Sequence, residues 1–409
     1  MAFARLSEAQ ALRPFSWWRQ IAVAMTLAAA MAVAGCTNTL NVGDLSAATA
    51  AAPNPSASPS VGTGDFKVGL VLPLSASGNA GAVAQTMRNA AELALAELNS
   101  PSVQLLPKDD AGTAQGAQAA VQQAIDEGAQ VILGPLFAYS ITNAKPIARN
   151  RGIPMIAFST DSSVAAPGVY LLGFLPESGV DRIVGYAVSQ GKHSFIALVP
   201  ANAYGSVAEA EFKQSVARRG ARIVALEHYG DDRNKIGDIA RVIAQSASQA
   251  DALFIPDGGD GVTDVIAALS AAGVNLHQFA LMGPQLWDDD PKIWANPQLE
   301  GAWYPAPDPA GYKDFAERYR SRYRQDPLRP ATQAYDAVSL IVALVRTQGP
   351  SPHITNEVLT NPSGFAGKDG AFRFRTDGTN QRGLAVLKVT PSGGQPIAPA
   401  PRTFPASAT

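Results

Sequence analysis

Short apolar segments alternate with helical patterns through most of this sequence after residue 66. The apolar run Lys67–Leu74 ends at a Ser-Ala-Ser-Gly loop, which predicts a buried strand followed by a turn. Apolar residues then recur at helical spacing from Val83 to Leu98, so one face of that helix should pack on a sheet. The alternation continues to the apolar run Phe279–Met282. Because alternating strands and helices build parallel sheets that are covered on both faces, the sequence predicts an α/β fold.

The N-terminus has a different pattern, which is typical of an export signal. Arg5, Arg13 and Arg19 form a basic region, and Ile21–Ala34 is a run of small and apolar residues. This run is too short to span a bilayer comfortably, since a membrane-spanning helix needs roughly 20 apolar residues. We therefore expect residues 1–35 to be a signal peptide that is removed.

The residues that close this signal resemble the lipobox of bacterial lipoproteins. They read Val33-Ala34-Gly35-Cys36, and Cys36 is the only cysteine of the chain. The resemblance implies that Cys36 carries lipid and anchors the protein to a membrane without a transmembrane helix. A lipidated Cys36 would leave no thiol for a disulfide, a metal site or catalysis. The alternative is an ordinary buried cysteine behind a cleaved signal.

The composition of the next segment predicts a linker, and that of the whole chain limits the partners. Residues 36–65 follow the signal, and Ala, Ser, Thr, Pro, Gly and Asn dominate Thr37–Gly64, which favours disorder. The rest of the 409-residue chain is long enough for two lobes. A net charge of −2 gives no indication of a nucleic-acid partner.

The folded part resembles the type I periplasmic binding proteins, whose best-known member is the Leu/Ile/Val-binding protein. The resemblance rests on segments that occur in the family's order: Lys67–Ser75, Ile132–Leu136, Gly152–Ile156, Asn202–Gly205 and Ala334–Ala337. It implies two doubly wound parallel-sheet lobes joined by a hinge of three crossovers. Lobe one would comprise residues 66–176 and 283–375, and lobe two residues 177–282 and 376–395. Residues 396–409 are expected to form a disordered tail.

In this family a ligand lies in the cleft between the lobes, beside the loops that follow the strands. The resemblance therefore predicts these cleft residues: Ser75, Ser77, Tyr139, Ser140, Ser159, Thr160, Asp161, Tyr204 and Asp257, with Phe137 and Gly258 beside them. Amino-acid binders of the family have a threonine where Asp161 stands. Its carboxylate would repel an α-carboxylate, which predicts weak binding of amino acids, although it could instead contact an ammonium group.

A further resemblance connects the chain with the penicillin-binding protein activators, a lipoprotein subset of this fold. It is carried by Ile156–Asp161, Gly168–Phe174, Phe254–Gly259, Leu286–Asp289 and Gly364–Gly370. It implies a periplasmic lipoprotein that binds a class A penicillin-binding protein and stimulates its transpeptidase. The helical-repeat domain that the best-studied activators carry at their N-terminus has no counterpart in this sequence.

The alternative function is that of a solute-binding protein, which would deliver an amino acid or a similar metabolite to an ABC permease. Thr37 follows the cysteine where an aspartate would favour retention at the inner membrane, so we expect an outer-membrane anchor. A long linker from that anchor suits an activator that reaches through the cell wall toward a synthase.

No motif in the sequence predicts catalysis, a metal or a cofactor. The loop Asp257–Gly261 lacks the spacing of a Ca²⁺ loop and the Gly-Lys-Ser/Thr of a phosphate loop. The histidines His193, His228, His277 and His353 are widely separated. A Gly-x-Ser-x-Gly nucleophile motif does not occur either. We therefore expect a binding protein without enzymatic activity.

Overall fold

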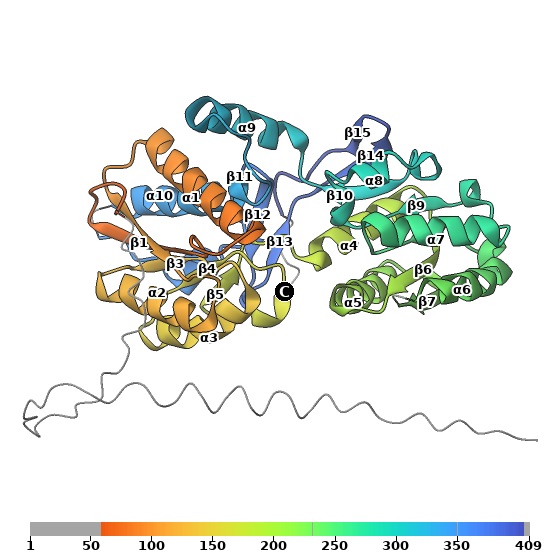
Figure 1. The fold of residues 1–409 in the computed structure, drawn as a ribbon, viewed down its shortest axis with the longest axis horizontal. Coiled ribbons are helices and arrows are strands. Elements are labelled where there is room, and N and C mark those ends of the chain that lie inside the picture. Colours follow the sequence, from red (N-terminus) through yellow and green to blue (C-terminus); the bar gives the residue numbers. More distant parts are fainter. Residues whose placement is uncertain (1–58, 231, 350, 405–409) are drawn as a thin grey trace, which may run out of the picture. The chain divides into compact units, whose positions relative to one another are not determined.

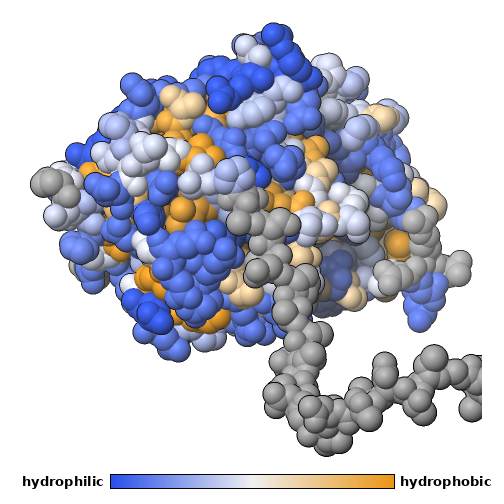
Figure 2. Space-filling model, turned by 60° about the vertical axis from the view of Figure 1, so that its left-hand side comes forward, coloured by the Kyte–Doolittle hydropathy of each residue, from blue (hydrophilic) through white to orange (hydrophobic). Residues whose placement is uncertain are grey.

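The computed structural model describes residues 59–230, 232–349 and 351–404. The predicted signal peptide 1–35, the predicted lipidation site Cys36 and most of the predicted linker lie outside these residues. Within the described part, no helix combines the length and the apolar character needed to cross a membrane. Hydrophilic residues cover most of the face seen in Figure 2, and apolar residues show between them.

Lobe one is built on a parallel sheet of five strands in the order β2-β1-β3-β4-β5. The strands are β1 (Phe66–Leu72), β2 (Val103–Asp109), β3 (Val131–Leu133), β4 (Met155–Ala157) and β5 (Val169–Leu171). One face carries α1 (Asn79–Leu98) and α10 (Ala331–Gln348), and the other carries α2 (Ala114–Asp126) and α3 (Ala138–Asn150), as Figure 1 shows.

Strand β1 shows why the sequence produces this layered packing. Val68, Leu70 and Leu72 are buried in the apolar core beneath α1 and α10, whereas Val71 is buried in the core beneath α2 and α3. Successive side chains of a strand point to opposite faces, so an apolar run fills both cores. At Gly69 a Cβ atom would lie 2.8 Å from the Cβ of Ala124, so glycine lets α2 pack close to the sheet.

Lobe two is built on a mixed sheet of seven strands in the order β15-β14-β10-β9-β8-β6-β7. The strands are β6 (Ser194–Pro200), β7 (Arg222–Tyr229), β8 (Ala252–Phe254), β9 (Ala280–Met282), β10 (Trp303–Ala306), β14 (Ala385–Thr390) and β15 (Gly393–Ala398). β6 to β10 pair in parallel, and β14 and β15 are added antiparallel at one edge. Helices α4 (Pro176–Ser189) and α5 (Ala203–Arg218) share one apolar core, and α6 (Arg233–Ser246) and α7 (Gly259–Ala271) share the other. The predicted α/β fold with two doubly wound lobes is therefore confirmed.

Six further elements complete the two lobes. They are α8 (Pro291–Trp294), α9 (Pro309–Tyr323), α11 (Asn356–Leu359), β11 (Phe365–Gly367), β12 (Gly370–Phe374) and β13 (Asn380–Arg382). β11, β12 and β13 form a separate antiparallel sheet. The amide of Asn380 donates hydrogen bonds to the carbonyl oxygens of Leu171 (2.8 Å) and Gly173 (2.7 Å), so this small sheet is joined to lobe one.

The strand pairings move three of the predicted lobe boundaries. Residues up to Ala306 belong to lobe two, because β10 pairs with β9 and β14, whereas residues 283–375 had been assigned to lobe one. β13 belongs with lobe one, although residues 376–395 had been assigned to lobe two. The predicted disordered tail 396–409 begins inside strand β15. The chain thus crosses between the lobes after β5, after β10 and after β13.

Candidate functional site

A cavity of about 360 Å³ lies between the two lobes, and we call it the inter-lobe cavity. Its lining comes from the loop after β4, the crossover after β5, the first turn of α5, the segment after β9 and the start of α10. The lining residues are Thr160, Phe174, Leu175, Pro176, Tyr204, Gln285, Leu286, Asp288, Arg329, Pro330 and Gln333. Several of these segments follow the carboxyl ends of parallel strands, where ligands bind in open α/β sheets.

The walls of the inter-lobe cavity combine apolar surface with a few polar groups. Phe174, Leu175 and Leu286 supply apolar surface, and Leu286 is 47% exposed. Gln333 is buried, and its Oε1 has no hydrogen-bond partner among the described residues. Burial raises the pKa of Tyr204, and the nearby Asp257 and Glu177 raise it further, so its hydroxyl stays neutral and can donate a hydrogen bond. A ligand with an apolar body and one polar end would match these walls.

Asp288 and Arg329 bring charge to the same cavity. Burial raises the pKa of Asp288 to about 6, although the positive charge of Arg329 opposes the rise. Arg329 forms an ion pair with the fully buried Asp369, with Nη1 and Oδ1 2.8 Å apart. Its guanidinium also lies 4.6 Å from the ring centre of Tyr312. Arg329 is therefore held in place, and Asp288 can change its charge between pH 5 and 7.

A buried polar network supports the cavity wall from behind. Asp336 on α10 accepts a hydrogen bond from the backbone N–H of Lys368 (2.7 Å), and burial together with the negative Asp369 raises its pKa. The ring of Phe174 has the guanidinium of Arg382 at 4.3 Å and that of Arg329 at 5.5 Å from its centre. These contacts fix the crossover after β5 against lobe one.

Two of the predicted cleft residues, Thr160 and Tyr204, line the inter-lobe cavity. The side chain of Asp161 caps a single helical turn instead, because its Oδ1 accepts a hydrogen bond from the backbone N–H of Ser163 (3.0 Å). The hydroxyl of Ser159 accepts the N–H of Asp161 (3.0 Å) in the same loop. Ser159 and Asp161 therefore shape the loop that presents Thr160.

The predicted residues after β1 and β3 do not line this cavity. The backbone N–H of Ser75 donates to Asp109 (3.2 Å), and Ser77 is exposed. Tyr139 is 49% exposed, stacks on Phe137 with 5.4 Å between ring centres, and donates its hydroxyl to the carbonyl of Gly112 (2.8 Å). Ser140 is buried.

Asp257 lies within lobe two and lines a separate cavity of about 340 Å³. It accepts the hydroxyl of Tyr229 (2.7 Å) and the N–H of Gly258 (2.8 Å). Its carbonyl accepts the indole N–H of Trp287 (2.8 Å), the residue before Asp288. Asp257 thus helps to position the segment that carries Asp288. Among the described residues, no cluster of three or more His, Cys, Asp or Glu side chains could hold a metal ion.

Sequence reasoning missed Arg329, Gln333, Asp288 and the buried carboxylates behind them. A usable signal was present in Gln333 and Asp336, because polar residues interrupt the small and apolar residues in the first part of α10. A buried polar residue inside an apolar helix requires a partner, so it indicates a polar network or a ligand.

A sequence profile described as periplasmic binding protein matches residues 65–395. The chain belongs to this family. Membership implies a periplasmic location for the protein. No curated protein matches the chain at a significant level.

Solved structures share the fold of this periplasmic binding protein. A proposed branched-chain amino acid ABC transporter from Rhodospirillum rubrum has 20% identity and a TM-score of 0.72, with 81% of this chain and 99% of that chain covered. An ABC transporter substrate-binding protein from Desulfitobacterium hafniense in complex with Leu has 19% identity, a TM-score of 0.61 and coverages of 81% and 99%. An ABC transporter solute-binding protein from R. palustris in complex with benzoate has 20% identity, a TM-score of 0.57 and coverages of 84% and 99%. At these identities the likeness shows the leucine-binding-protein-like fold.

Proposed function

We propose that this periplasmic binding protein is a solute-binding protein that holds a small amphipathic molecule with an amino group. The observation that carries the proposal is the inter-lobe cavity, whose lining offers two hydrogen-bond acceptors: the Oε1 of Gln333, which has no partner among the described residues, and the carboxylate of Asp288. An ammonium or amide N–H of a ligand would satisfy these acceptors. The apolar walls around Phe174 and Leu286 would hold the ligand's hydrocarbon part.

Amino acids and their close derivatives have this chemistry. Asp161 was expected to repel an α-carboxylate, but its side chain caps a helical turn and does not line the cavity. Arg329 lies on the lining and can face a carboxylate while it remains paired with Asp369. The benzoate and leucine complexes of proteins with the same fold support an apolar ligand with a charged end.

Isothermal titration calorimetry with the twenty amino acids and with benzoate tests the proposal. We expect at least one apolar amino acid to bind with a Kd below about 100 µM. Tyr204→Phe should weaken that binding about fivefold, since one hydrogen bond contributes about 1 kcal/mol. Tyr139→Phe is the matched control, because Tyr139 lies outside the cavity lining. Binding of benzoate without binding of any amino acid would contradict the assignment of an amino group.

Stimulation of a class A penicillin-binding protein is the second function, and it stays a prediction from the sequence resemblance. The experiment that separates the two functions adds the purified protein to such a synthase and measures transpeptidation without any small ligand. A raised rate would support the activator. If deletion of the gene causes an uptake defect, while cross-linking of the cell wall and β-lactam sensitivity stay normal, the activator function would be refuted.

Attachment to a membrane through a lipid on Cys36 also stays a prediction, as does its outer-membrane location. Cell fractionation with labelled palmitate compares the wild type with Cys36→Ser. We expect label and membrane association in the wild type alone. A labelled serine variant or a soluble wild type would contradict the anchor.

A further inference from the structure

Residues 399–404 follow β15, a strand of lobe two, and their contacts lead back to lobe one. We call this segment the C-terminal strap. The match to the family profile ends at residue 395, so the strap lies beyond the part of the chain that the family accounts for. It is a link between the lobes in addition to the crossovers after β5, β10 and β13.

The first part of the strap is held by lobe two. The carbonyl oxygen of Pro399 accepts a hydrogen bond from Nη2 of Arg182 on α4 (3.0 Å). Ala400 packs against the apolar core that α6 and α7 share. These contacts continue the attachment of β15, which is paired with β14. The start of the strap therefore has to move with lobe two.

The last part of the strap is held by lobe one. The guanidinium of Arg373 on β12 lies 4.9 Å from the ring centre of Phe404. The same ring packs on Gly364, where a Cβ atom would lie only 2.9 Å from the Cε2 of Phe404. The carbonyl oxygen of Pro401 would lie 2.3 Å from a Cβ atom at Gly383, whose N–H is hydrogen-bonded to β12 (2.8 Å). The end of the strap therefore has to move with lobe one.

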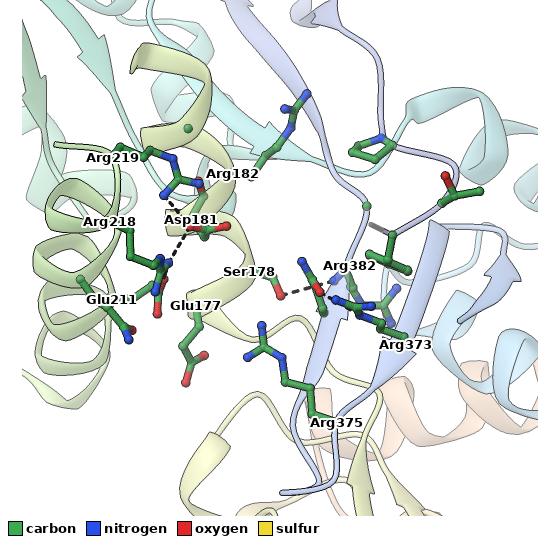
Figure 3. Close-up of a pocket in the computed structure, with 17 residues that line it drawn as sticks. Glu177, Ser178, Asp181, Arg182, Glu211, Arg218, Arg219, Arg373, Arg375 and Arg382 are labelled. Atoms are coloured by element: carbon green, nitrogen blue, oxygen red, sulfur yellow. Dashed lines mark hydrogen bonds and ion pairs between the residues drawn. The ribbon is translucent and has the colours of Figure 1, made fainter. Parts of the chain in front are cut away.

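Arg182 joins the strap to the third crossover. Its Nε donates to the carbonyl oxygen of Leu384, between β13 and β14, at 2.7 Å, while its Nη2 donates to Pro399. A guanidinium presents its donors in a rigid planar fork, so it holds the two segments at a fixed spacing. Figure 3 shows Arg182 on α4 and Arg373 on the small sheet of lobe one. The strap connects these two sides.

The composition of the strap makes it stiff. Pro399 and Pro401 flank Ala400. Proline fixes φ and has no N–H to donate, so the segment cannot extend the ladder of β15 and favours an extended, semi-rigid backbone. A stiff segment that is attached at both ends transmits the movement of one lobe to the other, whereas a flexible segment would only uncoil.

We propose that the C-terminal strap is a restraint across the hinge, which limits the range of movement between the two lobes. A rotation of the lobes would separate Phe404 from Arg373 or Pro399 from Arg182, so arrangements that break these contacts are less populated. Access to the inter-lobe cavity depends on the same movement. The strap would therefore also slow the exchange of a ligand there, a consequence that rests on the proposed function.

The experiment measures distances between the lobes by double electron–electron resonance, without any ligand. Two spin labels are attached to the full-length chain, through Arg149→Cys on α3 of lobe one and Val242→Cys on α6 of lobe two. Both side chains are exposed. Cys36→Ser removes the only native cysteine, so the labels occupy two defined positions.

Three variants are compared with this labelled chain. A chain that ends after Ala398 keeps β15 intact and lacks the strap, and it should raise the population outside the main distance peak at least about tenfold. Phe404→Ala should raise that population about threefold, as the loss of one exposed cation–π contact predicts. Arg402→Gln is the matched control, because this arginine is on the strap itself and its side chain is exposed, and it should leave the distances unchanged.

An unchanged distance distribution in the shortened chain would overturn the proposal, and so would equal broadening in Arg402→Gln. Circular dichroism shows whether the shortened chain folds. If it does not, Phe404→Ala decides the question, because it changes one partly exposed side chain, and an unchanged distribution there would overturn the proposal as well. Because no ligand is present, the result does not depend on whether the inter-lobe cavity binds an amino acid.

Discussion

The inter-lobe cavity and the cavity lined by α4 and α5 each contain a partly buried carboxylate, but its surroundings differ. In the inter-lobe cavity, burial raises the pKa of Asp288 from 3.8 to about 6, and the charge of Arg329 only partly opposes this. The other cavity, of about 510 Å³, is lined by α4, α5, β12 and β13 and by six arginines (Figure 3), and we call it the arginine cavity. There burial also opposes ionisation of Asp181, but hydrogen bonds from Arg219, Ser215 and Arg218 outweigh it and lower the pKa to about 2. The difference is the number of donors that reach the carboxylate.

This contrast shows how one fold builds two kinds of cavity lining. The inter-lobe cavity has apolar walls and a carboxylate that can be neutral or charged near pH 6, so it can select a ligand by shape and by a single amino group. The arginine cavity is lined by six arginines and three carboxylates, so charged groups dominate its lining. The first residues of α4 lie between them: Pro176 lines the first cavity and Glu177 lines the second.

The largest expected effect concerns the ion pairs beside the two cavities. Asp369→Asn should lower the free energy of unfolding by about 3 kcal/mol, because it leaves Arg329, whose side chain is 24% exposed, without its counter-charge. Asp181→Asn should cost no more than about 1 kcal/mol, since the side chains of Asp181 and Arg218 are 35% and 45% exposed. Urea denaturation measures both values. Equal losses would show that the two cavities do not differ in the burial of their charges.

A smaller effect is expected in the pH dependence of ligand binding to the inter-lobe cavity. If an amino group contacts Asp288, the association constant should rise roughly tenfold from pH 5 to pH 7, as a carboxyl with a pKa of about 6 becomes ionised. Calorimetry at a series of pH values gives the profile. Asp288→Asn should flatten it, and Asp181→Asn should preserve it. A profile that stays steep in Asp288→Asn would assign the titration to another group.

The smallest effect is expected in the pH dependence of stability, and it has opposite signs at the two carboxylates. The contribution of Asp288 is present below about pH 4 and is lost as the pH rises through about 6, because its folded pKa is raised. The contribution of Asp181 is present above about pH 4 and is lost as the pH falls through about 2, because its folded pKa is lowered. Asp288→Asn should therefore flatten the curve of unfolding free energy against pH between pH 4 and 6, and Asp181→Asn should flatten it between pH 4 and 2. Unfolding curves over this range measure it, and the same slope change in both variants would contradict the contrast.

The candidate site was predictable only where it follows directly from strand order. Thr160 and Tyr204 come shortly after predicted strands, and both line the inter-lobe cavity. Ser75 and Tyr139 also follow strands, but their hydrogen bonds to Asp109 and Gly112 belong to the rim of lobe one. The position of a residue after a strand predicts the edge of the sheet on which it lies. It does not predict the direction of its side chain.

The sequence by itself determined the local structure of this protein. Apolar runs such as Lys67–Leu74 have to be buried, and their alternation with amphipathic helices is a local property that leads to covered parallel sheets. Only the tertiary structure decided which sheet each late strand joins, because β10, β13 and β14 are short and their pairing depends on partners far away in the chain. The same holds for the charges. Arg329 meets Asp369, and Arg373 and Arg375 face α4, because the chain crosses three times between the lobes and brings distant residues to one place.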